Sequence, residues 1–424
     1  MKIKPRIFKG TRDFLPSAMI KRKWVIERIS KIYEMYGFEP LDTPAIEYYE
    51  ILGGKYGEEG EKLIYRFKDP GNRDVGLRYD LTVPLARLVA MHPEIKYPFK
   101  RYQIAPVWRA DSPQKGRFRE FYQCDIDTVG AKDLLADAEV LRVITHILEA
   151  LNFNNYTVLL NSRKIIKAIA ELARVDDEKE LARILDKRDK IGDEKVLELL
   201  RKKDMKDAEV YVEHIIEGNY DDLDSSPYGE EGLNEINKVL HLAQKLGIKE
   251  SGVRFEPLLA RGLDYYTGPI FEVIVEEPKI GSIASGGRYD NLIGVFSKRA
   301  YPATGGSFGL ERVLLVMEEL GLFPFEKLSK VQILVSWFNK NDWNYMFPVV
   351  KSLRERGYNV SFYLGKSGFR GQLGYARDKH IPYVLFAGEE ESKKGVFVIK
   401  DMARKEQKIV TKEELFAFLK DINV

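Results

Sequence analysis

Three arginines in separate, glycine-bounded segments give this sequence its clearest chemical signal. Arg109 follows the stretch APVW, Arg261 follows PLLA, and Arg312 stands within GGSFGLERV. A guanidinium group is planar and binds oxygen-rich anions such as phosphate through paired hydrogen bonds. Because all three arginines stand among aromatic and acidic residues, they predict one site for a nucleotide and a small polar molecule. That combination fits the activation of an amino acid by ATP.

The segment around Arg312 predicts a glycine-rich strand that turns into a helix, with the arginine in the first helical turn. Gly305, Gly306 and Gly309 leave room for a flat ligand close to the backbone. A guanidinium group in that place can stack on a purine and reach phosphate oxygens. The motif alone fits equally well an ordinary surface arginine on a helix that faces the core.

Arg109 is expected at the end of an apolar strand, where packing can fix its side chain for contact with the α-phosphate of ATP. Phe121, on the returning strand, offers an aromatic face to the adenine. The loop between the two strands carries Lys115, Arg117 and Arg119, which suit a triphosphate or an RNA end. A charged hairpin tip is also typical of any solvated turn, so the alternative stays open.

Composition limits the class of protein more than its activity. With 424 residues, 44% hydrophobic and 31% charged, the chain is long enough for about two to four globular domains. A net charge of +3 permits a basic face for nucleic acid without requiring one. Cys124 is the single cysteine and the five histidines lack zinc spacing, so we expect neither disulfide nor zinc site. Without a membrane-length apolar run or a signal peptide, the cytoplasm is the expected compartment.

Hydrophobic periodicity and breakers divide the chain into elements. We expect a helix over 17–36, capped by Ser17 and ended by Gly37, and a strand that turns into a helix over 77–90. Two strands should flank the loop DSPQKGRFRE, and a helix should follow over 133–151. Residues 164–246, rich in Lys, Glu, Asp and Leu, predict a helical insertion. This insertion is either a solvated addition without chemistry or an arm that touches a large substrate.

From about residue 330 the pattern changes to strands that alternate with helices, which predicts a separate domain with a mixed or parallel sheet. The expected strands are VQILVSW, YNVSFYL, YVLFAG and VFVIK, with helices over 341–356 and 371–379. In the last helix, TKEELFAFLK, Thr411 and Glu414 form a capping box.

Taken together, these segments resemble the class II aminoacyl-tRNA synthetases. Arg109 matches the arginine of that class's second motif, and Arg312 that of its third. FEPLDTPAIE, with Pro44, resembles the first motif, which forms a dimer interface in that class. The second motif commonly reads Arg-x-Glu, whereas here Arg109 is followed by Ala110 and Asp111, a shorter carboxylate with the same charge.

Within this class, LARGLDYYTGPIFEV and ASGGRYDNL resemble the two signature peptides of the histidyl-tRNA synthetases, and FKGTRDFLP and LRYDLTVPLAR are also similar to that family. The resemblance covers nearly the whole chain. It implies an α/β fold of the α+β kind, with an antiparallel-sheet catalytic domain over 1–325 that holds the helical insertion. A mixed α/β anticodon-binding domain should follow over 326–424.

The resemblance also implies residues for the amino acid, namely Asp80, Thr82, Gln123, Asp127, Tyr265, Tyr266 and Tyr289. Asp127 matches the acidic position that faces the imidazole, and Tyr266 the position that hydrogen-bonds the ring from the other side. Asp80, Thr82 and Gln123 match positions for the α-amino end, where an ammonium group needs acceptors. A pocket that pairs both ring nitrogens rejects isosteres that leave a buried group unpaired.

For the nucleotide the resemblance implies contacts from Arg109, Asp111, Arg117, Phe121, Arg261 and Arg312. Arg109 and Arg261 carry the catalytic role at the α-phosphate, although Arg261 could instead form a structural ion pair with Asp264. Gln114, Lys115 and Arg117 are the candidate contacts for the acceptor end of tRNA(His). Magnesium is expected with the ATP, with no dedicated metal site in the chain, and the protein is expected to be a homodimer.

Two other readings remain open from the sequence. One is a non-catalytic paralogue such as the regulatory subunit of ATP phosphoribosyltransferase, which shares the catalytic fold but typically lacks an anticodon domain. The other is a protein-binding scaffold with a synthetase-like body. Against both, Arg109, Arg261, Arg312 and a C-terminal domain are all present in this sequence.

Overall fold

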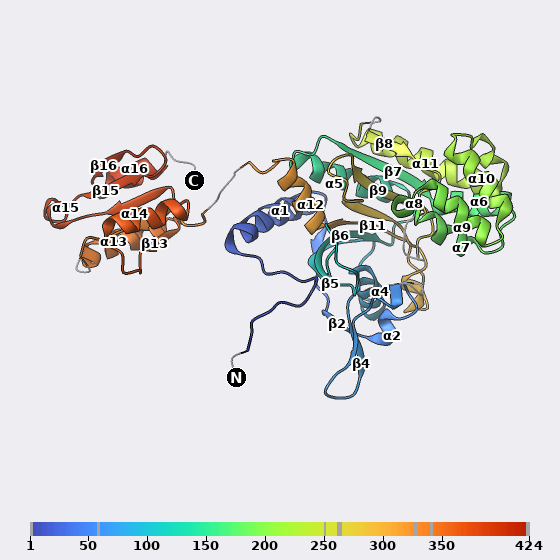
Figure 1. Cartoon of the computed structure of the whole chain (residues 1–424), viewed down its shortest axis with the longest axis horizontal. Helices are drawn as coiled ribbons and strands as arrows, with labels where there is room; N and C mark the ends of the chain where they lie inside the picture. The colour runs from blue at the N-terminus through green and yellow to red at the C-terminus, as the bar shows by residue number, and fades with distance from the viewer. Residues whose placement is uncertain are drawn as a thin grey trace. The chain divides into compact units, whose positions relative to one another are not determined.

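The computed structural model of the chain describes residues 3–56, 60–249, 252–260, 265–324, 329–339 and 342–420. Grouped by internal contacts, the chain forms two compact units, Met1–Asp13 with Arg22–Leu322 and Phe14–Lys21 with Phe323–Val424. Each unit has sheets of its own (Figure 1). None of the described helices has the length and apolar character needed to cross a membrane.

An eight-stranded sheet forms the centre of the larger unit. Its strands are Glu39–Pro40 (β1), Phe99–Trp108 (β5), Glu120–Val129 (β6), Tyr156–Ser162 (β7), Val253–Phe255 (β8), Pro269–Val275 (β9), Ala284–Arg288 (β10) and Ala303–Gly309 (β11). The order is β1-β5-β6-β11-β10-β9-β7-β8. The strands from β5 to β7 in this order pair antiparallel, and β1 and β8 add parallel edges. The antiparallel sheet expected from the resemblance is therefore confirmed, as are the two strands around the charged loop.

Strand alternation sends neighbouring residues of β6 to opposite faces of this sheet. Ile126 lies opposite Gly306, and a side chain at Gly306 would meet Val140 and Ile144 of the helix Leu135–Ala150 (α5). Asp127 lies opposite Gly305, on the other face. Gln123, Asp125 and Asp127 therefore share the face that α5 leaves uncovered.

Two more helices, Pro16–Met35 (α1) and Leu310–Glu319 (α12), hold this part of the unit together. Arg22 of α1 and Glu311 of α12 form a buried ion pair of 2.9 Å, and the second oxygen of Glu311 accepts a hydrogen bond from the Tyr122 backbone. The prediction that Ser17 caps α1 is wrong, because the helix begins at Pro16. Proline is well tolerated in a first turn, where its missing N–H has no helical partner. Gly37, at a φ of 76°, ends the helix as expected.

The segment over 164–246 is helical, as expected. Its helices are Arg163–Leu172 (α6), Glu178–Leu185 (α7), Arg188–Ile191 (α8), Asp193–Lys202 (α9), Lys206–Ile216 (α10) and Pro227–Lys245 (α11). They gather at the β7 side of the large sheet (Figure 1). Arg188 ties α8 to the sheet, since its Nη1 lies 2.9 Å from Oε1 of Glu256, directly after β8.

A small antiparallel sheet lies before the first long hairpin. Its strands Ile46–Tyr48 (β2), Arg66–Lys68 (β3) and Asp74–Leu77 (β4) take the order β2-β4-β3. The helix Tyr49–Leu52 (α2) contacts this sheet, and the helix Thr82–Met91 (α4) contacts α2. The predicted turn from strand into helix over 77–90 is confirmed, and residues 78–81 between them carry Asp80 to the edge of the large sheet.

The smaller unit has a five-stranded mixed sheet in the order β13-β12-β14-β15-β16. Its elements are Ile333–Val335 (β12), Trp343–Glu355 (α13), Val360–Phe362 (β13), Phe369–Asp378 (α14), Tyr383–Phe386 (β14), Glu389–Lys394 (α15), Phe397–Asp401 (β15), Gln407–Val410 (β16) and Lys412–Lys420 (α16). The mixed α/β prediction is confirmed; α15 and β16 were not foreseen. The Thr411 and Glu414 side chains bond each other's backbone N–H at 3.2 and 2.8 Å, which is the predicted capping box.

Candidate active site

Two adjoining pockets open on the face of the large sheet that carries Gln123, Asp125 and Asp127. The residues that line both are Arg109, Asp111, Arg117, Gln123, Ser285 and Ser307. The two pockets therefore form one cleft, whose floor comes from β6, β10 and β11.

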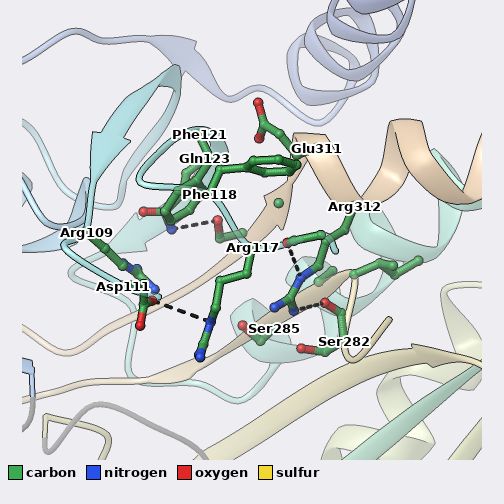
Figure 2. Close-up of a pocket in the computed structure, with 15 residues that line it drawn as sticks. Arg109, Asp111, Arg117, Phe118, Phe121, Gln123, Ser282, Ser285, Glu311 and Arg312 are labelled. Carbon is green, nitrogen blue, oxygen red and sulfur yellow. Dashed lines mark hydrogen bonds and ion pairs between the residues drawn. The ribbon is translucent and has the colours of Figure 1, made fainter. Parts of the chain in front are cut away.

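Every described residue that the sequence assigns to the nucleotide lines the first pocket. Arg109, Asp111, Arg117, Phe121 and Arg312 all line it, although they come from segments up to about 200 positions apart. Figure 2 shows Arg109 and Arg312 at opposite sides of this pocket, with Arg117 between them. Arg261, the remaining residue of that prediction, lies outside the described residues, as does Asp264.

Arg109 is held by contacts on several sides. Its Nε donates to the Tyr79 carbonyl at 3.1 Å, and its guanidinium carbon lies 4.2 Å from the Tyr79 ring centre and 5.1 Å from that of Phe121. Cation–π contacts of this kind fix the plane of a guanidinium group. The strand end thus presents a positioned cation where the two pockets meet.

Arg312, in the first turn of α12, is positioned by the charged loop. Its Nε donates to the Gly116 carbonyl at 3.1 Å and its Nη1 to the Ser282 carbonyl at 2.6 Å. Gly116 has a φ of 71°, in the left-handed region that favours glycine, so the loop can turn its carbonyl to the arginine. Arg117 reaches toward Asp111, with Nε and Oδ2 3.5 Å apart.

The three residues expected to contact the tRNA acceptor end share one loop, but their side chains differ in exposure. Gln114 and Arg117 exchange backbone hydrogen bonds of 3.1 and 2.9 Å, which closes a tight turn. Arg117 lines both pockets, whereas Gln114 and Lys115 are exposed. Lys115 pairs with Glu319 at the end of α12, 2.6 Å away. Gln114 and Lys115 therefore lie on the outer side of the loop.

The second pocket collects all seven residues that the sequence assigns to the amino acid: Asp80, Thr82, Gln123, Asp127, Tyr265, Tyr266 and Tyr289. In its aromatic wall, Tyr265 packs edge to face with Tyr289, with ring centres 5.7 Å apart, and in a tilted arrangement with Tyr266, with ring centres 5.0 Å apart. Burial raises the pKa of both Tyr265 and Tyr266, so their hydroxyls stay protonated and able to donate.

Asp127 lies at the base of this pocket, 3% exposed. The Tyr289 hydroxyl donates to its Oδ1, and Nη2 of the fully buried Arg101 lies 2.6 Å from its Oδ2. Burial raises the pKa of Asp127 to about 6, and the Arg101 charge opposes that rise. With its pKa held at about 6, the carboxylate is still mostly anionic at pH 7 and able to accept from an N–H donor.

A family model for histidyl-tRNA synthetase matches residues 10–313, and one for an anticodon-binding domain matches residues 332–422. The chain belongs to the histidyl-tRNA synthetase family.

Relatives in this family match over nearly the full chain. A histidine–tRNA ligase of Cytophaga hutchinsonii is 41% identical, over 97% of this chain and 98% of its own. One of Aeropyrum pernix is also 41% identical, over 95% of each chain. A solved histidyl-tRNA synthetase structure from Nostoc sp. superposes with a TM-score of 0.85 at 28% identity, covering 99% of this chain and 100% of the other.

The cleft contains residues that sequence reasoning missed. Ser282, Ser285 and Phe118 line the first pocket, and Tyr56, Tyr79 and Asp125 line the second. Asp125 carried a usable signal, because Gln123 and Asp127 had been assigned and period-two alternation places residue 125 between them on the same face. Ser285 and Tyr79 stood within the quoted peptides ASGGRYDNL and LRYDLTVPLAR, and Phe118 within the charged loop, but nothing in those segments singled them out.

The helical insertion also reaches the amino-acid pocket. Asp186, directly after α7, and Lys190 of α8 are among its lining residues. The ion pair between Arg188 and Glu256 holds this corner against the large sheet. This placement argues against a solvated addition without chemistry, while the reading of a lid or arm that touches a large substrate stays a prediction.

Gly305 provides a test of the amino-acid pocket. A Cβ at this position would lie 2.1 Å from Oδ1 of Asp127 and 2.5 Å from the Ile126 carbonyl oxygen, so Gly305→Ala must displace that carboxylate and shift the strand beside it; unfolding monitored by circular dichroism checks that the variant is folded. We expect the KM for histidine in ATP–pyrophosphate exchange to rise at least tenfold, about 1.4 kcal/mol, with the KM for ATP changed less than twofold. Gly374→Ala, on α14 with nothing within 4 Å of the new methyl group, is the control. Equal increases for histidine and ATP would contradict this assignment.

Proposed function

We propose that the chain is a histidine–tRNA ligase, which activates L-histidine with ATP to histidyl-adenylate and pyrophosphate and then transfers histidine to the 3′ end of tRNA(His). The observation that carries this proposal is the continuity of the cleft through Arg109. The arginine stands between an arginine-lined pocket and a pocket whose buried Asp127 and tyrosines suit an imidazole. Membership of the family supports the same reaction.

The first step needs orientation and charge stabilisation more than a protein nucleophile. In it, the histidine carboxylate attacks the α-phosphorus of ATP and pyrophosphate leaves. Arg109 is proposed to hold the α-phosphate where negative charge develops, since its guanidinium is already fixed by Tyr79 and Phe121. Arg261 is proposed for the same oxygens on the resemblance alone. In the second step, the terminal ribose hydroxyl of tRNA attacks the activated carbonyl.

Asp111, Arg117, Phe121 and Arg312 are proposed to hold the rest of the nucleotide. Phe121 lines the first pocket and can stack on the adenine, while Arg312 can reach both the purine and the phosphates. Magnesium is proposed to enter bound to ATP, as part of the substrate. The carboxylates of this pocket are already engaged, Glu311 by Arg22 and Asp111 by Arg117, so phosphate oxygens are the natural ligands for the ion.

The partners of the chain are proposed from the same resemblance. A catalytic domain over 1–325 and an anticodon-binding domain over 326–424 would contact tRNA(His), with Gln114, Lys115 and Arg117 near the acceptor end. Exposed apolar side chains near Pro44 support a homodimer through this face, since such patches commonly mark interfaces; they are Ile46, Tyr48, Phe67 and Met91. A cytoplasmic location is proposed for the enzyme.

The proposal is tested by ATP–pyrophosphate exchange with each of the twenty amino acids in turn. Exchange with histidine alone is the expected result, because Asp127 and the tyrosines provide hydrogen-bond partners for an imidazole. Absence of exchange from a folded protein that binds histidine would favour a regulatory paralogue. Absence of both exchange and histidine binding would favour a scaffold.

A further inference from the structure

Three buried oxygen acceptors that line the amino-acid pocket have no hydrogen-bond donor among the described residues. They are Oδ2 of Asp80, Oε1 of Gln123 and Oδ1 of Asp125. An unpaired buried acceptor costs free energy comparable to a lost hydrogen bond, so such groups normally have a partner. Three of them in one pocket indicate a ligand with several donors.

Two of these acceptors point to the pocket because of their position on β6. Gln123 and Asp125 stand two residues apart on β6, opposite Gly309 and Ser307 of β11, and therefore point to the same face. The amide Nε2 of Gln123 donates to the Ser307 hydroxyl at 3.1 Å. With its nitrogen engaged in this way, the Gln123 amide turns its oxygen toward the ligand space.

Asp80 reaches the same pocket from the opposite wall. Its Oδ1 accepts from the Tyr56 hydroxyl at 3.1 Å and from the Val83 backbone at 3.0 Å, which fixes the carboxylate at the start of α4. Oδ2 is thereby left for a ligand. Thr82, expected from the sequence to share this task, also lines the pocket, and its side chain hydrogen-bonds the Tyr265 hydroxyl.

The buried charges of the pocket do not balance. Asp80, Asp125 and Asp127 are 2%, 2% and 3% exposed. Arg101 forms its ion pair with Asp127, while Arg78 is bound to Asp42 and to the carbonyls of Thr43 and Pro106. No described cation forms an ion pair with Asp80 or Asp125. Arg109 also lines this pocket, but it acts on Asp80 without forming an ion pair with it. A buried carboxylate requires compensation, so a cationic ligand beside Asp80 and Asp125 would supply charge that no described ion pair provides.

We propose that Asp125 binds the α-ammonium group of the substrate amino acid, together with Asp80 and Gln123. An ammonium group has three N–H donors and one positive charge, which match three acceptors and a surplus of carboxylates. This inference rests on the proposed function, since it assumes that the second pocket holds an amino acid. It makes Asp125 a specificity-determining residue that favours ligands with a free amino group.

The test uses Asp125→Asn in the full chain with two probes, each of which lacks one of the two charged groups of histidine. Histamine has the imidazole and the ammonium group without the carboxylate, and 3-(imidazol-4-yl)propionate has the imidazole and the carboxylate without the ammonium group. Each is measured as a competitive inhibitor of histidine-dependent ATP–pyrophosphate exchange. We expect the inhibition constant of histamine to rise by about 10- to 100-fold, the range for a lost charged hydrogen bond, and that of the propionate to change less than twofold. An equal change for both probes, or no change for either, would overturn the inference.

Asp127→Asn is the matched control on the same strand, two residues away. Because Asp127 is assigned to the imidazole, which both probes contain, this variant should weaken both by similar factors. The contrast between the two asparagine variants separates an ammonium contact from a general disturbance of β6. A selective loss of histamine binding in Asp127→Asn as well would overturn the inference.

The unmodified protein offers a second measurement that does not depend on how the variant folds. Burial, with contributions from Asp127 and Asp80, raises the pKa of Asp125 to about 7 against the lowering effect of Arg101 and of the Ser307 hydroxyl. Arg78 also faces this carboxylate. A protonated Asp125 cannot pair with an ammonium group, so histamine affinity relative to that of the propionate should fall about tenfold from pH 8 to pH 6. The imidazole of each probe titrates with its own pKa, which the ammonium group lowers in histamine and the carboxylate raises in the propionate, so each affinity is first corrected for the measured ionisation of the free probe.

The outcomes distinguish this inference from the proposed function. Histidine-dependent exchange with a pH-independent probe ratio would overturn the role of Asp125 and leave the ligase proposal standing. A folded protein without exchange that binds neither probe would overturn both.

Discussion

Arg109→Ala is expected to reduce the kcat/KM of histidine-dependent ATP–pyrophosphate exchange by about 10²- to 10³-fold, the usual effect of removing one positioned donor from a developing charge. The reason is geometric. The guanidinium is fixed by the Tyr79 carbonyl and by the rings of Tyr79 and Phe121 where the two pockets meet. A group that is already in place stabilises charge without a reorganisation cost when the reaction occurs.

Two further variants make this result specific. Arg109→Lys keeps the charge but loses the planar fork, and should recover only part of the lost activity. Arg377→Ala removes an arginine that is 75% exposed and paired with Asp378, and should leave exchange unchanged. Unfolding monitored by circular dichroism checks that each variant is folded. Exchange within threefold of the unmodified rate in a folded Arg109→Ala would refute the assigned role.

Arg101→Met is expected to lower the free energy of unfolding by about 3–5 kcal/mol, because it removes one partner of a buried ion pair. Arg101 is fully buried, its Nη2 lies 2.6 Å from Asp127 Oδ2, and the same nitrogen donates to the Leu81 carbonyl at 3.2 Å. Methionine fills much of the same volume, so the loss reports mainly the uncompensated carboxylate. Denaturant unfolding at pH 8 measures it.

The pH dependence of this loss has a definite sign. Burial already raises the pKa of Asp127 to about 6, and removal of Arg101 should raise it further. A carboxyl with a raised pKa in the folded state binds protons more tightly than in the unfolded state, so its cost to stability grows as pH rises. The variant should therefore lose less stability at pH 5 than at pH 8. Arg101→Met combined with Asp127→Asn should be more stable than Arg101→Met alone, and the opposite order would refute a buried ion pair.

Much of the architecture followed from local patterns. The insertion helices, the strands around the charged loop, the capping box at Thr411 and the alternating elements after residue 330 depend on periodicity and on residues adjacent in sequence. Ser17 is the exception. Serine is a good capping residue, yet α1 begins one residue earlier, at Pro16. Element boundaries depend on small local differences in free energy that packing can override.

The site, like the fold, was predicted only in part from the sequence. The sequence by itself determined the residue types that the chemistry needs, because motifs such as RAD, GGRYD and GLER keep them at fixed local spacing. Only the tertiary structure decided which of them share one cleft with Asp125, Arg101 and the insertion residues Asp186 and Lys190. Charge balance and hydrogen-bond satisfaction in a buried pocket depend on groups from distant segments, and no local pattern in the chain encodes those distances.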